Sequence, residues 1–100
     1  MRVLVSCANG SGTSLMMMKS TEKALKKIGI PITQIHHTSI SEGKSTAKNY
    51  DVVLTPQNFV NMFDSAKSRG VTVLGIRNVM SAKEIEEAIR ATDLPERFTK

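Results

Sequence analysis

Residues 3–15 read VLVSCANGSGTSL and join a short apolar run to a polar turn that contains the only cysteine of the chain. The β-branched run predicts a strand that ends at Cys7, because such side chains favour buried, pleated strands. Asn9, Gly10 and Gly12 then predict a tight turn, since glycine adopts positive φ angles that other residues avoid. The cysteine is therefore expected at the carboxyl end of a strand, directly before a turn into a helix.

Four strand-like runs alternate with helical stretches, at residues 2–6, 32–37, 51–55 and 71–76. The second run is polar and is expected at a sheet edge, which gives the order 2-1-3-4. The fold class is therefore α/β, a three-layer, Rossmann-like or flavodoxin-like domain with helices on both faces of a four-stranded parallel sheet. Ligands of such sheets bind where the strand order reverses, here between strands 1 and 3, beside Cys7.

Apolar residues at helical spacing mark the buried faces of three expected helices. These residues are Leu15, Met18, Leu25, Ile28, Phe59, Met62, Phe63, Ala66, Ile85, Ala88 and Ile89. The first helix should stop at Gly29, the second should begin at Pro56, and Ser81 with Glu84 forms a capping box at the start of the last. Residues 39–49 are expected to be a loop with a short helix, and residues 93–100 a flexible tail of the single domain 1–100.

Composition excludes several classes of function. The net charge is +5, yet with four aromatic residues and dispersed lysines we expect no nucleic-acid partner. His36 and His37 are adjacent in an expected strand and face opposite sides, so with one cysteine they give no metal-ligand spacing, and no metal is expected. No signal peptide or membrane span is apparent, so we expect a cytoplasmic protein.

The turn after Cys7 is suited to hold a tetrahedral anion, because successive backbone N–H groups and a helix N-terminus converge there. The same field should lower the pKa of the Cys7 thiol and favour a nucleophilic thiolate. The expected phosphate-binding residues are Ala8, Asn9, Gly10, Ser11, Gly12, Thr13 and Ser14. The turn that leaves strand 3, at Thr55, Pro56 and Gln57, is the candidate second wall of this site.

Other glycine-rich loops fit less well. A nucleotide P-loop needs a lysine after the last glycine, and dinucleotide binding needs a third glycine where Leu15 stands. A low-molecular-weight tyrosine phosphatase loop needs an arginine where this chain has Thr13. Rapid hydrolysis is therefore not expected, although a phosphatase remains an alternative, as does a non-catalytic regulatory domain.

Two segments resemble a known family, the enzyme IIB components of the bacterial phosphoenolpyruvate-dependent sugar phosphotransferase system (PTS). The first is CANGSGTSLMMMK at residues 7–19, and the second is VLGIRNVMS at residues 73–81. Among the lactose, galactitol and ascorbate-like subfamilies, they are most similar to the ascorbate type, whose loop reads CGNGxGSS. Ala8 and Thr13 depart mildly from that loop.

The resemblance implies a phosphotransferase that carries a phosphoryl group covalently on Cys7 and needs no other cofactor. Cys7 would receive this group from a phosphohistidine of a cognate IIA protein. It would then transfer the group to a sugar or polyol, ascorbate or a related compound, bound by the membrane transporter IIC. The protein would associate transiently with IIC, and the resemblance does not assign roles to His36 and His37.

Overall fold

A computed structural model describes residues 1–7, 12–78, 81–92 and 94–98, without the side chains of residues 12–14 and 97–98. Its strands are β1 (Arg2–Cys7), β2 (Gln34–Ser39), β3 (Val52–Pro56) and β4 (Thr72–Ile76). Its α-helices are α1 (Gly12–Ile28), α2 (Ile40–Thr46), α3 (Asp64–Ser68), α4 (Ala82–Arg90) and α5 (Leu94–Phe98), and its 3₁₀ helices are η1 (Ala47–Asn49) and η2 (Gln57–Phe63).

The four described strands form one parallel sheet in the order β2-β1-β3-β4, as the sequence predicts. Strand β1 pairs with β2 over its whole length, so that Cys7 lies opposite Ser39. On its other side β1 pairs with β3, where Val5 lies opposite Leu54. The polar strand β2 is an edge, and the order reverses between β1 and β3.

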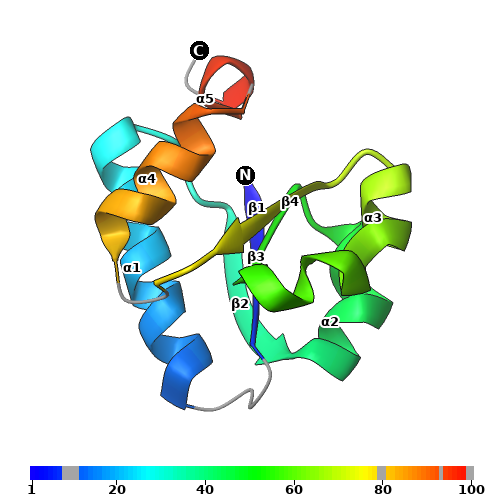
Figure 1. The fold of residues 1–100 in the computed structure, drawn as a ribbon. Coiled ribbons are helices and arrows are strands. Elements are labelled where there is room, and N and C mark those ends of the chain that lie inside the picture. The colour runs from blue at the N-terminus through cyan, green and yellow to red at the C-terminus, as the bar shows by residue number, and fades with distance from the viewer. Residues whose placement is uncertain (8–11, 79–80, 93, 99–100) are drawn as a thin grey trace.

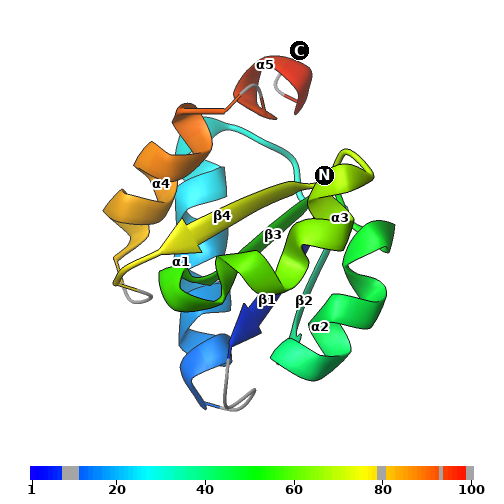
Figure 2. The same cartoon turned by 45° about the vertical axis from the view of Figure 1, so that its right-hand side comes forward.

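Helices cover both faces of the sheet and give three layers (Figures 1 and 2). The face with α1 and α4 carries an apolar cluster that includes Val3, Val5 and Leu54. The face with α2, η2 and α3 carries another cluster around Leu4 and Phe63. Because side chains alternate along a strand, Val3, Val5 and Cys7 of β1 belong to the first core and Leu4 to the second.

Helix α1 ends as expected but buries a different face. The N–H groups of Gly29 and Ile30 both donate to the Leu25 carbonyl, and Gly29 has a φ of 98°, which glycine adopts without strain. Leu15 was expected to be buried, yet it is exposed, and Met17 is fully buried instead. Four consecutive apolar residues, 15–18, leave the helical face ambiguous, and packing against β1 decides it.

The region after β3 also differs from expectation. Pro56 closes β3 instead of opening a helix, and the first turns are the 3₁₀ helix η2. Phe63 and Ala66 are buried as predicted, whereas Met62 is exposed, because the tighter 3₁₀ turn rotates the stripe. Residues Leu94–Phe98 form α5 with Leu94 fully buried, so this part of the chain is structured where a flexible tail was expected.

The start of α4 shows half of the predicted capping box. The Ser81 hydroxyl accepts a hydrogen bond from the Glu84 N–H at 3.1 Å. The Glu84 carboxylate does not return to Ser81, because it accepts from the N–H groups of Arg77 and Asn78 at 2.6 and 3.1 Å. This carboxylate therefore closes the turn after β4, which supports a structural role for Arg77 and Asn78.

Candidate functional site

Cys7 is the last residue of β1 and lies at the carboxyl edge of the sheet, next to the reversal of strand order. Its side chain belongs to the same apolar cluster as Val3 and Val5, so it points toward α1 and α4. The thiol is 1% exposed. The structure thus confirms the predicted place of Cys7 in the fold and adds that its sulfur faces the core.

The loop expected to bind phosphate falls only partly within the described residues. Ala8, Asn9, Gly10 and Ser11 lie outside them. Gly12, Thr13 and Ser14 form the first turn of α1, so Gly12 has a helical backbone where a positive φ was expected. Four residues, 8–11, therefore connect Cys7 at the strand end to the N-terminus of α1.

The thiol of Cys7 contacts another sulfur. Its Sγ donates a hydrogen bond to the Met17 Sδ at 3.5 Å, and Met17 is fully buried. Burial raises the pKa of the Cys7 thiol above its ordinary value of 9.0. The expected lowering of this pKa is therefore wrong for the resting structure, because desolvation disfavours the thiolate.

The residues proposed as the second wall of the site, Thr55 and Pro56, lie on opposite faces of the sheet. Val52 and Leu54 share the core of Cys7 and Val53 does not, so Pro56 points toward the Cys7 face and Thr55 away from it. The hydroxyl of Thr55 is buried and has no hydrogen-bond partner among the described residues. The exposed Gln57 follows directly and begins η2.

The two histidines lie on the edge strand β2, with ring centroids 6.2 Å apart. In register, His36 pairs with Leu4 and His37 with Val5, which are three and two residues before Cys7 on β1. No group of three His, Cys, Asp or Glu residues in the described part of the chain could hold a metal ion. None of the helices described is long and apolar enough to cross a membrane.

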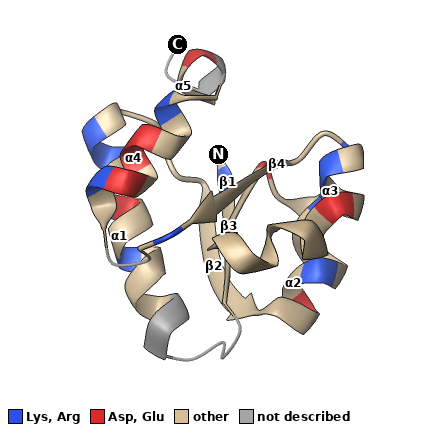
Figure 3. Ribbon diagram, viewed as in Figure 1, with Lys and Arg blue, Asp and Glu red and all other residues tan. Residues whose placement is uncertain are grey.

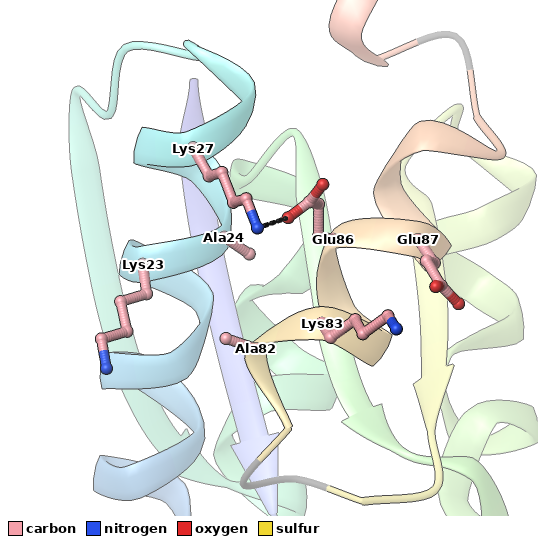
Figure 4. Close-up of a pocket in the computed structure, with 7 residues that line it drawn as sticks. All are labelled: Lys23, Ala24, Lys27, Ala82, Lys83, Glu86 and Glu87. Carbon is pink, nitrogen blue, oxygen red and sulfur yellow. Dashed lines mark ion pairs between the residues drawn. The ribbon is translucent and has the colours of Figure 1, made fainter.

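A groove lies between α1 and α4 and has a volume of about 570 Å³ (Figure 4). It is lined by Lys23, Ala24, Lys27, Ala82, Lys83, Glu86 and Glu87. Across it Lys27 Nζ lies 3.7 Å from the Glu86 carboxylate, which also pairs with Arg90 at 3.0 Å. The lining does not include Cys7, so this groove and the candidate nucleophile are separate features.

Gln57 lines a shallower groove of about 480 Å³ at the carboxyl edge, together with Gly75, Arg77, Glu84, Glu87 and Ala88. Gly75 allows η2 to pack closely on β4, since a Cβ at position 75 would lie 2.4 Å from a methyl group of Val60. Lys and Arg residues occur on several elements and not on one face alone (Figure 3). The charge distribution therefore singles out no region, and Cys7 remains the centre of the candidate site.

Comparison with known proteins places this site in a family. The family model of the PTS lactose/cellobiose-specific IIB subunit matches residues 2–91. The chain belongs to this family. The ascorbate-specific PTS EIIB component of Mycoplasma pneumoniae is 24% identical over 90 residues, which cover 89% of this chain and 90% of that relative.

A solved IIB structure has the same fold. It is the lactose-specific IIB component domain of the phosphoenolpyruvate:carbohydrate phosphotransferase system from Streptococcus pneumoniae, with a TM-score of 0.65. At 18% identity it covers 91% of this chain, and the chain covers 92% of it. The resemblance of this sequence to ascorbate- and lactose-like PTS IIB components is confirmed.

Two side chains of this IIB subunit have roles that sequence reasoning missed. Met17 contacts the candidate nucleophile, although the methionine run gave no signal for which member would do so. Glu84 holds the turn after β4, and the capping-box pattern marked the residue but not this contact. Both roles depend on tertiary packing and not on local sequence.

Proposed function

We propose that this IIB subunit carries a phosphoryl group on Cys7, between a IIA donor and a sugar bound by the membrane component IIC. The observation that carries the proposal is the position of Cys7, the only cysteine of the chain, at the end of β1 where the strand order reverses. Ligands of parallel α/β sheets bind at this point. Membership of the IIB family supports a phosphotransferase, since IIB subunits work with IIA and IIC partners.

The proposed reaction is an in-line transfer between two proteins. The Cys7 sulfur attacks phosphorus, the bond between phosphorus and the donor imidazole nitrogen breaks, and a sulfur–phosphorus bond forms. The thiol proton passes to the imidazole, which leaves as a neutral ring. Because the resting thiol has a raised pKa, the leaving imidazole is the base that this step requires.

The phosphoryl group would be held by the backbone N–H groups and hydroxyls of residues 8–14 and by the turn at residues 55–57. Within that turn, Pro56 is on the Cys7 face and Gln57 is exposed at the carboxyl edge, so these two residues are the better supported wall. Phosphoryl transfer depends mainly on positioning and charge stabilisation, which such neutral donors supply. A Gln57→Ala variant is expected to accept the phosphoryl group more slowly.

For the sugar, we propose ascorbate or a related sugar or polyol, on the similarity to the ascorbate-specific EIIB component. The protein would act in the cytoplasm and dock transiently on IIC. Purified sugar transport vesicles that contain IIC would test this, with ascorbate and lactose compared as phosphoryl acceptors. Phosphorylation of lactose but not ascorbate would overturn the ascorbate assignment and leave the carrier function intact.

The deciding experiment for the carrier function is an intact-mass measurement. The protein and a Cys7→Ser variant are incubated with phosphoenolpyruvate, the general phosphotransferase proteins and a panel of IIA components. The expected result is the gain of one phosphoryl group that maps to Cys7 and is absent from the variant. No gain from any donor, together with steady phosphate release from an aryl phosphate, would instead identify a phosphatase.

A further inference from the structure

In its contact with Met17, the proposed phosphoryl acceptor Cys7 lies buried in the core. The Cys7 sulfur is 1% exposed and lies 3.5 Å from the Met17 sulfur. A phosphohistidine must bring phosphorus and its three oxygens up to the attacking sulfur. Because Cys7 is 1% exposed, its sulfur would have to turn from the core toward the carboxyl edge to meet such a donor.

Met17 is fully buried where it makes this contact. It is 0% exposed, and its carbonyl accepts a hydrogen bond from the buried Thr21 hydroxyl at 2.7 Å. Its neighbours differ, since Met16 is 44% exposed and Met18 is half-buried at the edge of the same apolar cluster. Of these three consecutive methionines, Met17 is the one whose sulfur contacts the thiol among the described residues.

A thioether has a specific effect on a thiol. It carries no proton, so Cys7 must be the donor, and this contact retains the proton that the transfer reaction has to remove. A leucine would fill a similar volume without accepting a hydrogen bond. The methionine sulfur therefore does more than fill space beside Cys7.

We propose that Met17 is a positioning residue of the acceptor site: its thioether holds the Cys7 thiol in a buried resting position, and the sulfur must leave this contact before it attacks phosphorus. This inference rests on the proposed function, in which Cys7 accepts the phosphoryl group. During transfer the sulfur turns from Met17 toward the carboxyl edge, gives its proton to the donor imidazole and forms the bond to phosphorus. Met17 thus stabilises the buried, unreactive position of the thiol and does not contact the donor.

The first test compares Met17→Leu with the matched variant Met18→Leu and the natural protein. The rate of Cys7 alkylation by iodoacetamide is expected to rise about two- to fivefold in Met17→Leu only, the range that a hydrogen bond of about 0.5–1 kcal/mol gives at 1.36 kcal/mol per tenfold. Single-turnover phosphorylation should accelerate similarly, with an unchanged apparent KM for the IIA donor, because buried Met17 cannot contact it. Equal alkylation rates in the folded Met17→Leu and natural proteins would overturn the proposal.

A second measurement decides the matter if Met17→Leu fails to fold. With ¹³C-methyl methionine, the Met17 methyl resonance of the natural protein should shift when Cys7 is alkylated or replaced in Cys7→Ala, and it should shift more than that of Met18. Failure of the Met17 resonance to move would refute the contact. Alkylation needs no phosphoryl donor, so a chain that no IIA phosphorylates but whose Met17→Leu variant alkylates faster would contradict the carrier function alone.

Discussion

Replacing Thr55 with valine should stabilise this protein, although the substitution removes a polar group from a strand end beside the candidate site. The Thr55 hydroxyl is fully buried and has no hydrogen-bond partner among the described residues. A buried, unpaired hydroxyl costs about 1–3 kcal/mol of stability, and a buried methyl contributes about 0.8 kcal/mol. Valine keeps the branched shape, so we expect a net gain of about 1–2 kcal/mol after imperfect packing.

The chain offers a matched control for this substitution at Thr21. Thr21 is equally buried, but its hydroxyl donates to the Met17 carbonyl at 2.7 Å. Thr21→Val should therefore lose about 1 kcal/mol, the typical net value of one hydrogen bond. The same chemical change is thus expected to have opposite signs at two buried threonines.

Thermal unfolding followed by circular dichroism measures both variants. For a domain of this size, about 4 °C corresponds to 1 kcal/mol, so the midpoint should rise by about 4–8 °C in Thr55→Val and fall by about 4 °C in Thr21→Val. A lower midpoint for Thr55→Val would refute the reasoning and show that its hydroxyl has a stabilising partner.

Three further substitutions or conditions test the packing described above. Gly43→Ala should cost about 1–3 kcal/mol in urea unfolding, because its Cβ would lie 2.4 Å from the Ser6 Oγ. Ser6→Ala in the same chain should recover part of that cost, and strictly additive losses would argue against the clash. Leu94→Ala should lose about 2–5 kcal/mol as a fully buried leucine, and a midpoint close to that of the natural protein would mean that α5 does not pack on the core. Burial raises the Cys7 pKa above 9.0, so the folded state retains the proton after the unfolded thiol has lost it. The contribution of this thiol to the free energy of unfolding is therefore fully present below its unfolded-state pKa. It is lost as the pH rises through its folded-state pKa. Between about pH 7 and 10, the free energy of unfolding in urea should decline less for Cys7→Ser than for the natural protein. Identical declines in the two proteins would exclude this linkage.

The strands and their order were predictable because each signal is local. A buried parallel strand reads as a continuous apolar run, and the polar residues of β2 identify an edge. The position of Cys7 at the reversal then follows from the order alone. The alternation within β3 also places Thr55 and Pro56 on opposite faces, and counting from Leu54 could have found this from the sequence.

The remaining differences arise where tertiary contacts decide between equivalent local choices. The apolar run 15–18 fits more than one helical face, and packing against β1, which includes the contact with Cys7, selects Met17. Residues 94–98 are too short for a helical pattern to be recognised, and the burial of Leu94 depends on the cluster already formed by α1 and α4. The sign of the Cys7 pKa shift was missed for the same reason, because burial is not visible in the motif.

The core-facing thiol has a consequence for the redox chemistry of the protein. Oxidants such as peroxide react with exposed thiolates, and the resting Cys7 is neither exposed nor readily ionised. A carrier that depends on one cysteine would lose all function on a single oxidation. On the proposed function, the contact of that sulfur with Met17 would shield the acceptor from sulfenic acid formation and from mixed disulfides while no donor is bound.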